Sequence, residues 1–337
     1  MKPLVSILIP AYNAEEWIAD TIRSAARQTW EPKEIIVVDD GSTDRTSLIA
    51  HQFEWASVRV VRQRNQGAAA ARNTAFSMSH GDYIQWLDAD DLLAPDKIAR
   101  QMEVPNVLGS PRTLLSAAWG YFIYRPYRTQ FRSTSLWCDL SPVEFLLRKL
   151  GQRAFMQTAV WLVSRELAEA AGPWDRSLVY DDDGEYFCRV ILASTGIRFA
   201  AASRVYYRIA GSGSVSNIGQ SEAKLGDMWR SMQLQMRYLR SLEDSDRTRA
   251  ACVRYLEGYL VAFWPQRLDI VEEMHEAARA LGASLESPRL SWKYSWINSM
   301  VGWSCAKRVQ LFLRNAKWSW LHYWEKALYR IESRIFP

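Results

Sequence analysis

The sequence lacks several features that mark particular classes of protein. Its 337 residues contain only four cysteines, Cys138, Cys188, Cys252 and Cys305, which are far apart and form no CxxC pair. Only four histidines are present, and none lies in an HExxH motif. A secreted disulfide scaffold and a zinc enzyme are therefore disfavoured, and the cysteine usage indicates a reducing compartment, which we take to be the cytoplasm.

Three nucleotide-site and nucleophile motifs are also missing. The loop after the first apolar run reads "PAYNAEE", without G-x-G-x-x-G, and the chain has neither a G-x-x-x-x-G-K-[ST] nor a G-x-S-x-G motif. The sequence therefore disfavours assignment to the dinucleotide oxidoreductases, P-loop NTPases or α/β-hydrolases. No run approaches the roughly 18 apolar residues of a spanning helix, and "PLVSILIP" fits a buried strand better than a signal peptide.

What is present reads as a globular chain, with 48% hydrophobic and 23% charged residues. In the first hundred residues, apolar strands alternate with helical patterns. We expect strands at 4–10, 34–40, 58–63 and 82–87, and helices at 14–28, 45–55, 67–80 and 94–103. This rhythm predicts an α/β fold, with a mainly parallel sheet flanked by helices and ligands at the carboxyl ends of its strands.

The rest of the chain changes character twice. Residues 105–217 are mixed, with strand candidates at 114–124, 159–164 and 203–209 and helix candidates at 142–150 and 183–194. From about 218 onward the pattern is helical, with few strand signals. We therefore expect a catalytic domain over 1–217 and a helical region over 218–337.

Two groups of aspartates follow predicted strands. Asp39 and Asp40 end the second strand, and "YIQWLDADD" brings Asp88, Asp90 and Asp91 directly after the fourth. Two carboxylates at i and i+2 can hold a hard cation such as Mg²⁺ or Mn²⁺, and a carboxylate at a strand end can accept hydrogen bonds from a base or ribose. The alternatives are helix-capping turns without a ligand, because short acidic triplets also occur by chance.

Two further segments carry charged candidates. "NQGAAAARN" places Arg72 on a helix that starts after the third strand, where it can reach a bound anion, although most of its alanines are expected to serve packing. "VYDDDGEYFCRV" crowds Asp181, Asp182, Asp183 and Glu185, which favours a raised carboxylate pKa and a role as general base. The alternative is an acidic helix N-terminus stabilised by the helix dipole.

Taken together, these segments resemble family 2 glycosyltransferases. "VSILIPAYNAEEWIADTIRSAARQT", "EIIVVDDGSTDRT", "NQGAAAARN" and "GDYIQWLDADD" occur in the order and spacing of that family, over about residues 4–100. The resemblance weakens in the middle of the chain, returns at "DDDGEYFCRV" and "YYRIAGSGSVS", and ends beyond about 218. It implies a GT-A fold and an inverting transfer of sugar from a nucleotide donor.

The resemblance also implies roles for residues of the donor site. Pro10, Ala11 and Tyr12 match the segment that lines the nucleotide base. Asp40 matches the carboxylate that hydrogen-bonds the base, with Asp39 beside it.

The same resemblance implies which residues bind the diphosphate and which are catalytic. Arg72 matches a basic position near the nucleotide, and Asp88 and Asp90 match the DXD motif, the first near the ribose and the second on the metal, Mn²⁺ or Mg²⁺. Counting back from Arg189 places the family's Glu–Asp pair on Asp182 and Asp183, with Asp183 as catalytic base. Relatives often carry a histidine after "YYR", where this chain has Ala210, so the third metal ligand is open.

The expected activity is therefore metal-dependent transfer of a sugar from a nucleotide-diphosphate sugar, most plausibly UDP-linked, to a hydroxyl of a glycan or lipid-linked acceptor in cell-surface or exopolysaccharide synthesis. A non-catalytic sugar-nucleotide-binding or scaffold protein on the same fold is the alternative, and a nucleotidyltransferase is a third option. Nucleic acid is not an expected partner, since no recognition module is present. The sequence leaves the oligomeric state open.

The C-terminal segment concentrates positive charge and tryptophan. Residues 286–337 hold nine Lys/Arg, three Asp/Glu and six of the sixteen tryptophans. Apolar residues recur at helical spacing over 309–335 and share one face: Val309, Phe312, Leu313, Ala316, Trp320, Trp324, Ala327, Ile331 and Ile335. Two interpretations of 291–337 remain open, a helix resting on an anionic cytoplasmic membrane surface or a helix packed on the catalytic domain or a second subunit.

Overall fold

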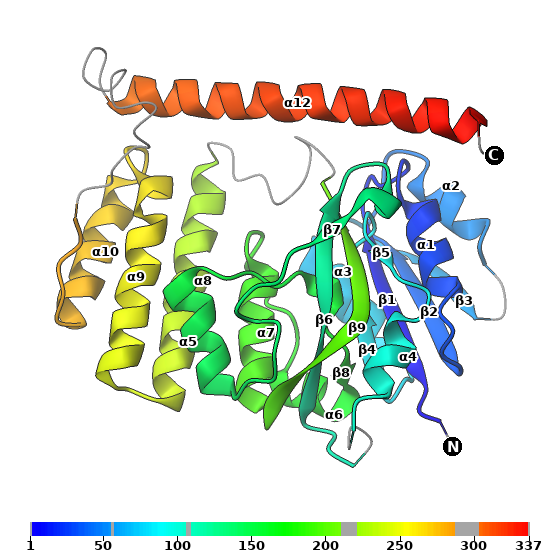
Figure 1. The fold of residues 1–337 in the computed structure, drawn as a ribbon, viewed down its shortest axis with the longest axis horizontal. Coiled ribbons are helices and arrows are strands. Elements are labelled where there is room, and N and C mark those ends of the chain that lie inside the picture. Colours follow the sequence, from blue (N-terminus) through cyan, green and yellow to red (C-terminus); the bar gives the residue numbers. More distant parts are fainter. Residues whose placement is uncertain (1, 55–56, 106–108, 210–220, 287–302, 336–337) are drawn as a thin grey trace.

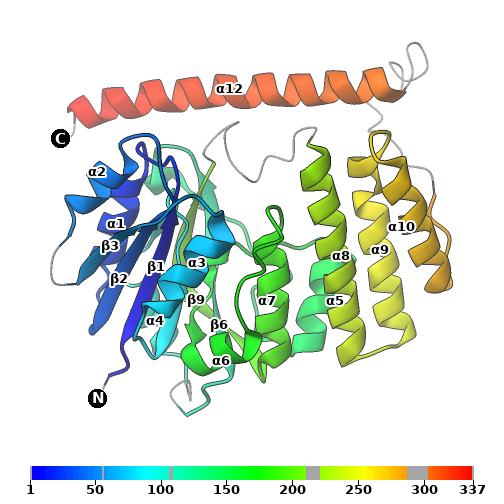
Figure 2. The same ribbon diagram turned by 180° about the vertical axis from the view of Figure 1, so that it is seen from behind.

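A computed structural model describes residues 2–54, 57–105, 109–209, 221–286 and 303–335, and the statements below concern these residues (Figure 1). An α/β part, a set of packed helices and one long helix are joined in that order along the chain. Figure 2 shows the same arrangement from behind.

The first sheet carries the expected parallel strands. Its strand order is β3-β2-β1-β4-β8, in which β1, β2, β3 and β4 run parallel and β8 is antiparallel to β4. The strands are β1 (Val5–Ala11), β2 (Lys33–Asp39), β3 (Val58–Arg62), β4 (Tyr83–Trp86) and β8 (Val163–Ser164). Residues along β1 and β2 are almost completely buried because helices cover both faces, as their unbroken apolar sequences predict.

A second sheet lies beside the first and was not expected. Its order is β5-β9-β6-β7, with β6 parallel to β9 and the two short strands antiparallel to their neighbours. The strands are β5 (Leu92–Leu93), β6 (Thr113–Phe122), β7 (Gln130–Phe131) and β9 (Gly196–Arg208). The candidate strand at 203–209 is thus the end of a longer strand, and β5 forms only because β9 pairs with it across more than a hundred residues.

Helices flank the first sheet on both sides (Figures 1 and 2). The expected helices are confirmed but shorter, since turns take up their first residues. They are α1 (Ile18–Ala26), α2 (Thr46–His51), α3 (Ala68–Ser77) and α4 (Lys97–Met102). The helix α6 (Arg165–Ala171) was missed, although Ser164 caps it by accepting a hydrogen bond from the Leu167 amide.

The middle and C-terminal helices form one continuous body with the sheets. They are α5 (Pro142–Gln152), α7 (Asp182–Ala193), α8 (Glu222–Leu242), α9 (Asp246–Phe263) and α10 (Leu268–Ala280). Leu225 and Met228 of α8 belong to the same buried apolar cluster as Phe187 of α7. The expected boundary at 217/218 lies outside the described residues, and the division into two domains stays a prediction.

The last helix, α12 (Trp303–Ile335), crosses the molecule at the carboxyl ends of the strands (Figure 1). Its contacts with the α/β part include Tyr329, which stacks on Tyr124 with ring centroids 5.9 Å apart. The helical pattern expected over 309–335 is therefore confirmed. Among the described helices, none combines the length and hydropathy that a bilayer-crossing segment needs.

Candidate active site

The candidate site is at the edge of the first sheet where β1, β2 and β4 end. Pro10 and Ala11 are the last residues of β1, and Ala11 pairs with Asp39 at the end of β2. Tyr12 follows with half of its surface exposed (51%), so its ring is available to a ligand. Asn13 has a left-handed backbone (φ 47°), and its amide donates to Ser42 Oγ at 3.0 Å, which ties the two loops together.

The two aspartates after β2 have different surroundings. Asp40 is buried, and its carboxylate accepts hydrogen bonds from Gln63 Nε2 (2.7 Å) and from the amides of Gln66 (3.0 Å) and Gly67 (2.8 Å). Asp39 is also buried, and its Oδ1 accepts a hydrogen bond from the Ser42 amide. Asp40 therefore organises the loop before α3, which the sequence did not indicate.

One carboxylate oxygen in this pair has no hydrogen-bond partner. Asp39 Oδ2 lies 3.2 Å from Arg62 Nε, but the two groups are not aligned for a hydrogen bond, and the oxygen is buried. A buried acceptor without a donor is costly, by about 1–3 kcal/mol, and such an atom at a strand end is a natural point of contact for a ligand donor.

Arg72 joins the two acidic segments. Its NH2 donates to Asp88 Oδ1 at 2.8 Å and its NH1 donates to Asp182 Oδ2 at 2.6 Å. The guanidinium is nearly buried and stacks over Trp174, with its central carbon 4.3 Å from the ring centroid. Arg72 thus brings together aspartates that lie 94 positions apart in the sequence.

The ionisation of this group is set by opposing effects. Burial alone lowers the pKa of Arg72, but Asp182 and Asp88 outweigh it, so the guanidinium stays charged. Burial raises the pKa of Asp182 to about 6, against the lowering effect of Arg72, with Asp183 and Asp88 raising it further. Three carboxylates share one cation here, and this imbalance keeps the site ready for another positive charge.

The other aspartates of the "DADD" segment, Asp90 and Asp91, have different roles. Burial, with a further contribution from Asp88, raises the pKa of Asp90 to about 7. Asp91 is completely buried, accepts a hydrogen bond from the Arg208 amide at 2.8 Å and also binds the Gln157 side chain. Asp91 therefore holds the loop to β9, whereas Asp88 and Asp90 are the partly exposed pair of the D-x-D motif.

The catalytic candidate Asp183 lies in the first turn of α7. Its Oδ1 accepts a hydrogen bond from the Gly184 amide (2.9 Å) and its Oδ2 from Thr158 Oγ1 (3.3 Å), and the side chain is partly exposed. Asp182 accepts a hydrogen bond from the Asp183 amide at 3.0 Å. The helix N-terminus thus supports both carboxylates, as the alternative interpretation of this segment expected.

Asp181 points the other way. It has a left-handed backbone (φ 58°), and its Oδ2 accepts hydrogen bonds from Ser231 Oγ (2.6 Å) and Gln235 Nε2 (2.7 Å) of α8. Burial raises its pKa to about 6. Of the three consecutive aspartates, two therefore face the site and one fastens α7 to α8. Glu185 is bound by Arg189 and Tyr238 instead of facing the site.

Three residues that position the site were missed from the sequence. Arg208 donates from Nε to the Asp90 carbonyl at 2.7 Å and stacks over Trp17, while Gln157 and Thr158 bind Asp91 and Asp183. Arg208 is the last residue of "YYR", so the motif did contain a signal, but Gln157 and Thr158 lie in a segment without one. Ala210 lies outside the described residues.

Metal-binding capacity is limited to a pair of side chains. Among the described residues, no three His, Cys, Asp or Glu side chains come together in a way that could hold a metal ion. Asp88 and Asp90 still suit a hard cation, since both are carboxylates and burial beside Asp88 raises the pKa of Asp90. Mg²⁺ and Mn²⁺ sites often have only one or two protein carboxylates, with phosphate and water completing the shell.

A mainly parallel sheet with acidic loops at its carboxyl edge is consistent with the GT-A fold, and comparisons with known proteins support that fold. Residues 6–136 match the model of glycosyl transferase family 2. This match lies in the N-terminal part of the chain and includes all but the first residue of β1, the strands β2 to β4 and the loops that follow them.

The alignments with sequence relatives cover only part of this chain and only part of each relative. TuaG of Bacillus subtilis, whose name refers to teichuronic acid biosynthesis, is 44% identical over 105 residues, 30% of this chain and 42% of TuaG. A glycosyltransferase of Rickettsia prowazekii is 30% identical over 200 residues, 58% of this chain and 60% of the relative. The chain therefore spans well under two thirds of the length of these relatives.

Solved structures share the fold over most of the chain. TarS of S. aureus (residues 1–349) in complex with UDP-GlcNAc superposes with a TM-score of 0.62, covering 82% of each chain at 17% identity. The complex of TarS with UDP gives a TM-score of 0.61. At this level of identity the likeness establishes the GT-A fold alone.

Proposed function

We propose that this chain is an inverting glycosyltransferase that moves a sugar from a UDP-sugar to a hydroxyl of a glycan or lipid-linked acceptor in cell-surface or exopolysaccharide synthesis. The observation that carries the proposal is the Arg72 bridge between Asp88 and Asp182, because it joins the D-x-D segment to the first turn of α7. The match of residues 6–136 to the family model supports the same reaction class.

The nucleotide is expected at the ends of β1 and β2. Tyr12 offers an exposed ring for the base to stack on, and Asp39 Oδ2 is the acceptor we propose for the imide N–H of uracil. We prefer Asp39 over Asp40 for this contact, since the oxygens of Asp40 already accept three hydrogen bonds from the loop before α3. The TarS structures with UDP and UDP-GlcNAc are consistent with a uridine donor.

Mn²⁺ or Mg²⁺ is the cofactor we propose, held by Asp90 and Asp88. When bound, the cation neutralises charge on the diphosphate leaving group. The raised pKa of Asp90, about 7, lets it hold a proton when no cation is bound. We propose that Asp90 releases this proton when the cation binds. Asp88 keeps its hydrogen bond from Arg72, which fixes the orientation of its second oxygen.

Asp183 is the base we propose for the acceptor. Its carboxylate takes the proton of the acceptor hydroxyl, whose oxygen then attacks the anomeric carbon. The bond between that carbon and the diphosphate oxygen breaks, and UDP leaves with the electron pair on the opposite face, so the configuration inverts. Thr158 and the Gly184 amide hold the carboxylate in place, which is what a positioned base requires.

A cluster of partly exposed aromatic side chains is suited to a sugar acceptor. Trp119 packs edge-on against Tyr121 and Phe155, with ring centroids 4.9 and 5.3 Å apart, and the latter two rings are 51% and 40% exposed. Phe155 lies three residues before Thr158, which binds Asp183. Such rings offer apolar faces to the C–H faces of sugars, as in many ligand pockets.

The proposed compartment is the cytoplasm, where nucleotide sugars are made and thiols stay reduced. The three cysteines in the described part of the chain, Cys138, Cys188 and Cys252, are all unpaired, which fits this proposal.

A screen of nucleotides by thermal unfolding tests the donor site. UDP and UDP-sugars in large excess over their Kd should stabilise the protein by about 2–4 kcal/mol with Mn²⁺ present, and ADP or GDP should not. Product analysis with the best donor then separates sugar transfer from nucleotide transfer. Stabilisation without any product under varied acceptors would instead favour the non-catalytic binding protein.

A further inference from the structure

The long helix α12 leaves one face unpacked, and its position is set by ion pairs on the other face. Arg125, a nearly buried residue that follows β6, donates from Nε to Glu325 (3.1 Å) and from NH1 to Glu332 (2.7 Å). Lys326 donates to Glu16 at 2.6 Å. The side of α12 that faces the body is therefore polar and charged.

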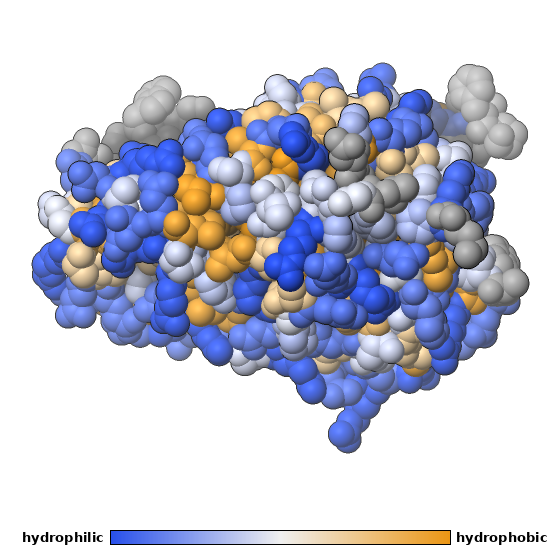
Figure 3. All heavy atoms as spheres, turned by 90° about the horizontal axis from the view of Figure 1, so that it is seen from below, coloured by the Kyte–Doolittle hydropathy of each residue, from blue (hydrophilic) through white to orange (hydrophobic). Residues whose placement is uncertain are grey.

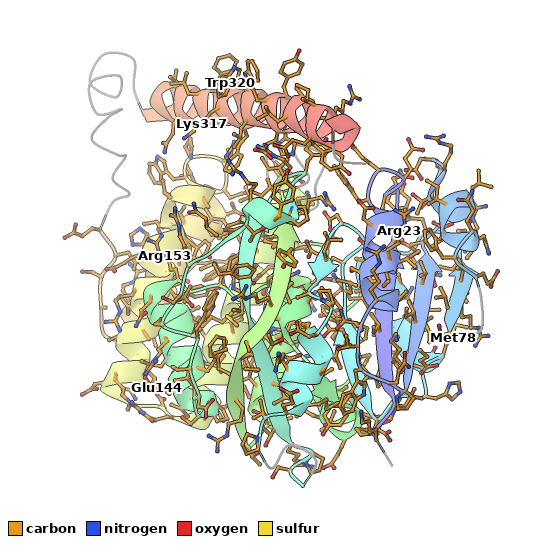
Figure 4. The ribbon with its side chains drawn as sticks, turned by 45° about the vertical axis from the view of Figure 1, so that its right-hand side comes forward. Arg23, Met78, Glu144, Arg153, Lys317 and Trp320 are labelled. Atoms are coloured by element: carbon orange, nitrogen blue, oxygen red, sulfur yellow. The ribbon has the colours of Figure 1, made fainter. Side chains whose placement is uncertain are left out.

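The apolar side of the same helix faces outward. Large side chains on it are mostly exposed, with 71% of Phe312, 63% of Trp320 and 54% of Ile331 accessible. Trp320 points away from the body in Figure 4. Of the interpretations left open by the sequence, packing of this apolar face on the catalytic domain is thus not what the structure has, because the charged side takes that place.

The charged residues described as exposed on α12, away from its ion pairs with the body, are basic. Over 303–335 the sequence has seven Lys/Arg and only two Asp/Glu, and both acidic residues, Glu325 and Glu332, are turned toward Arg125. Lys317 and Arg330 are exposed along the helix. Tryptophan and tyrosine, which favour the boundary between water and lipid, make up much of the outward surface, including Trp320, Tyr323 and Trp324.

The opposite side of the molecule differs. Viewed from there, the surface is largely hydrophilic, with one larger hydrophobic patch and smaller ones elsewhere (Figure 3). Among the described side chains, the exposed large apolar residues of α12 run from Phe312 to Ile331, about 30 Å along the helix. Such a stripe is unusual for a surface that meets only water.

We propose that the outward face of α12 rests on the surface of an anionic lipid bilayer. The aromatic and aliphatic side chains enter the headgroup region, and the basic side chains contact anionic headgroups. Since α12 lies over the carboxyl edge of the first sheet (Figure 1), the bilayer and the candidate site are on the same side of the protein. A lipid-linked acceptor could then reach the site without leaving the membrane. The inference concerns binding and holds whether or not the proposed chemistry does.

Vesicle flotation of the full chain tests the proposal. We expect the protein to float with vesicles of phosphatidylcholine containing about one third phosphatidylglycerol, to float much less with phosphatidylcholine alone, and to be released as salt is raised. The double variant Trp320→Ser/Trp324→Ser should lower the bound fraction at least about tenfold. Its matched control is Leu48→Ser, which removes another exposed apolar side chain, from α2 and not from α12, and should leave binding unchanged.

Charge is tested separately. Lys317→Glu should weaken binding to anionic vesicles, while Arg59→Glu, an exposed position on β3, should not. Thermal stabilisation by UDP should be the same in every variant, which reports folding and separates this inference from the donor site. Equal flotation of the double tryptophan variant and the unmodified protein would overturn the proposal. The proposal would also be overturned if the unmodified protein did not bind vesicles but formed a dimer that the double tryptophan variant could not form. In that case a second copy of the chain would cover the face.

Discussion

Arg72 NH1 and Asp182 Oδ2 lie 2.6 Å apart, although 110 positions separate them in the sequence. The pair connects α3 with the start of α7, and a second hydrogen bond from Arg72 reaches Asp88 after β4. One guanidinium therefore fixes the geometry between the segment that would hold the diphosphate and the helix that would hold the acceptor base.

Replacing Arg72 should show how far the stability of the site depends on this guanidinium. Arg72→Ala leaves two largely buried carboxylates without their cation, and we expect it to lower the free energy of unfolding at pH 8 by about 2–4 kcal/mol. At pH 5 the loss should be smaller, because Asp182, whose pKa is already raised to about 6, then takes up a proton. Urea unfolding at the two pH values measures both effects.

The control is Arg45→Ala. Arg45 pairs with Glu15 at 3.2 Å but is largely exposed, so its removal should change stability by less than about 1 kcal/mol. If the two variants were equally stable at pH 8, the buried bridge would not be structurally important.

Asp183→Asn should remove the base and preserve the fold. The amide keeps the size of the side chain but cannot accept a proton at neutral pH, so kcat should fall by about 10²–10⁴-fold while stabilisation by UDP is retained. The matched control is Asp246→Asn, which changes an exposed aspartate in the first turn of α9 and should leave kcat unchanged. Full activity of the Asp183 variant would assign the base to another group.

Asp90 should make the protein sensitive to pH when no cation is bound. Its pKa is raised from 3.8 to about 7, chiefly by burial, so the folded protein holds a proton that the unfolded chain releases. The stability that this proton contributes is fully present below about pH 4 and is lost as the pH rises through 7.

Asp90→Asn should remove this loss of stability at high pH, because asparagine does not titrate. In EDTA the variant should be more stable than the unmodified protein at pH 8, by about 1–2 kcal/mol, and the difference should shrink at pH 5. Mn²⁺ with UDP should stabilise the unmodified protein much more than the variant. Thermal unfolding with and without Mn²⁺ measures this, and Asp96→Asn, at an exposed aspartate, is the control. An identical response to Mn²⁺ in both proteins would remove Asp90 as a ligand.

Gly184 should be intolerant of any side chain. A Cβ at this position would lie 2.2 Å from Asp181 Oδ1, which is itself held by Ser231 and Gln235. Gly184→Ala should therefore shift the start of α7, lower stability by about 1–3 kcal/mol and reduce kcat.

Gly226→Ala is the comparison within another helix. The nearest atom to a Cβ there is a flexible Arg267 side-chain nitrogen at 3.6 Å, so alanine should be neutral or stabilising by up to about 1 kcal/mol. Equal effects at the two glycines would mean that Asp181 yields easily and does not position the catalytic turn.

The sequence by itself determined the first sheet and the edge of that sheet at which the candidate site lies. Continuous apolar runs at β1 and β2 can only be buried on both faces, so a parallel sheet follows, and parallel strands bring Asp39, Asp40 and Asp88 to one edge. The second sheet was not predictable, because β5 has two residues and exists only through its pairing with β9.

The tertiary structure decided how identical residue types divide their roles. Asp40 is committed to the loop at Gly67, Asp91 to β9 and Asp181 to α8. Their neighbours Asp90 and Asp183 stay partly exposed, and the buried Asp39 keeps one oxygen without a hydrogen bond. Neighbouring aspartates have the same local propensities, so only the donors that long-range packing brings to each oxygen can distinguish them.

The same holds for α12. Its periodic apolar residues determined that a helix forms. The direction of its apolar face depended on Arg125, which lies 200 positions before Glu325 and 207 before Glu332 and binds both on the opposite face. Periodicity specifies that a helix has two unlike faces. Which face turns inward is decided by the partners that the rest of the fold presents to it.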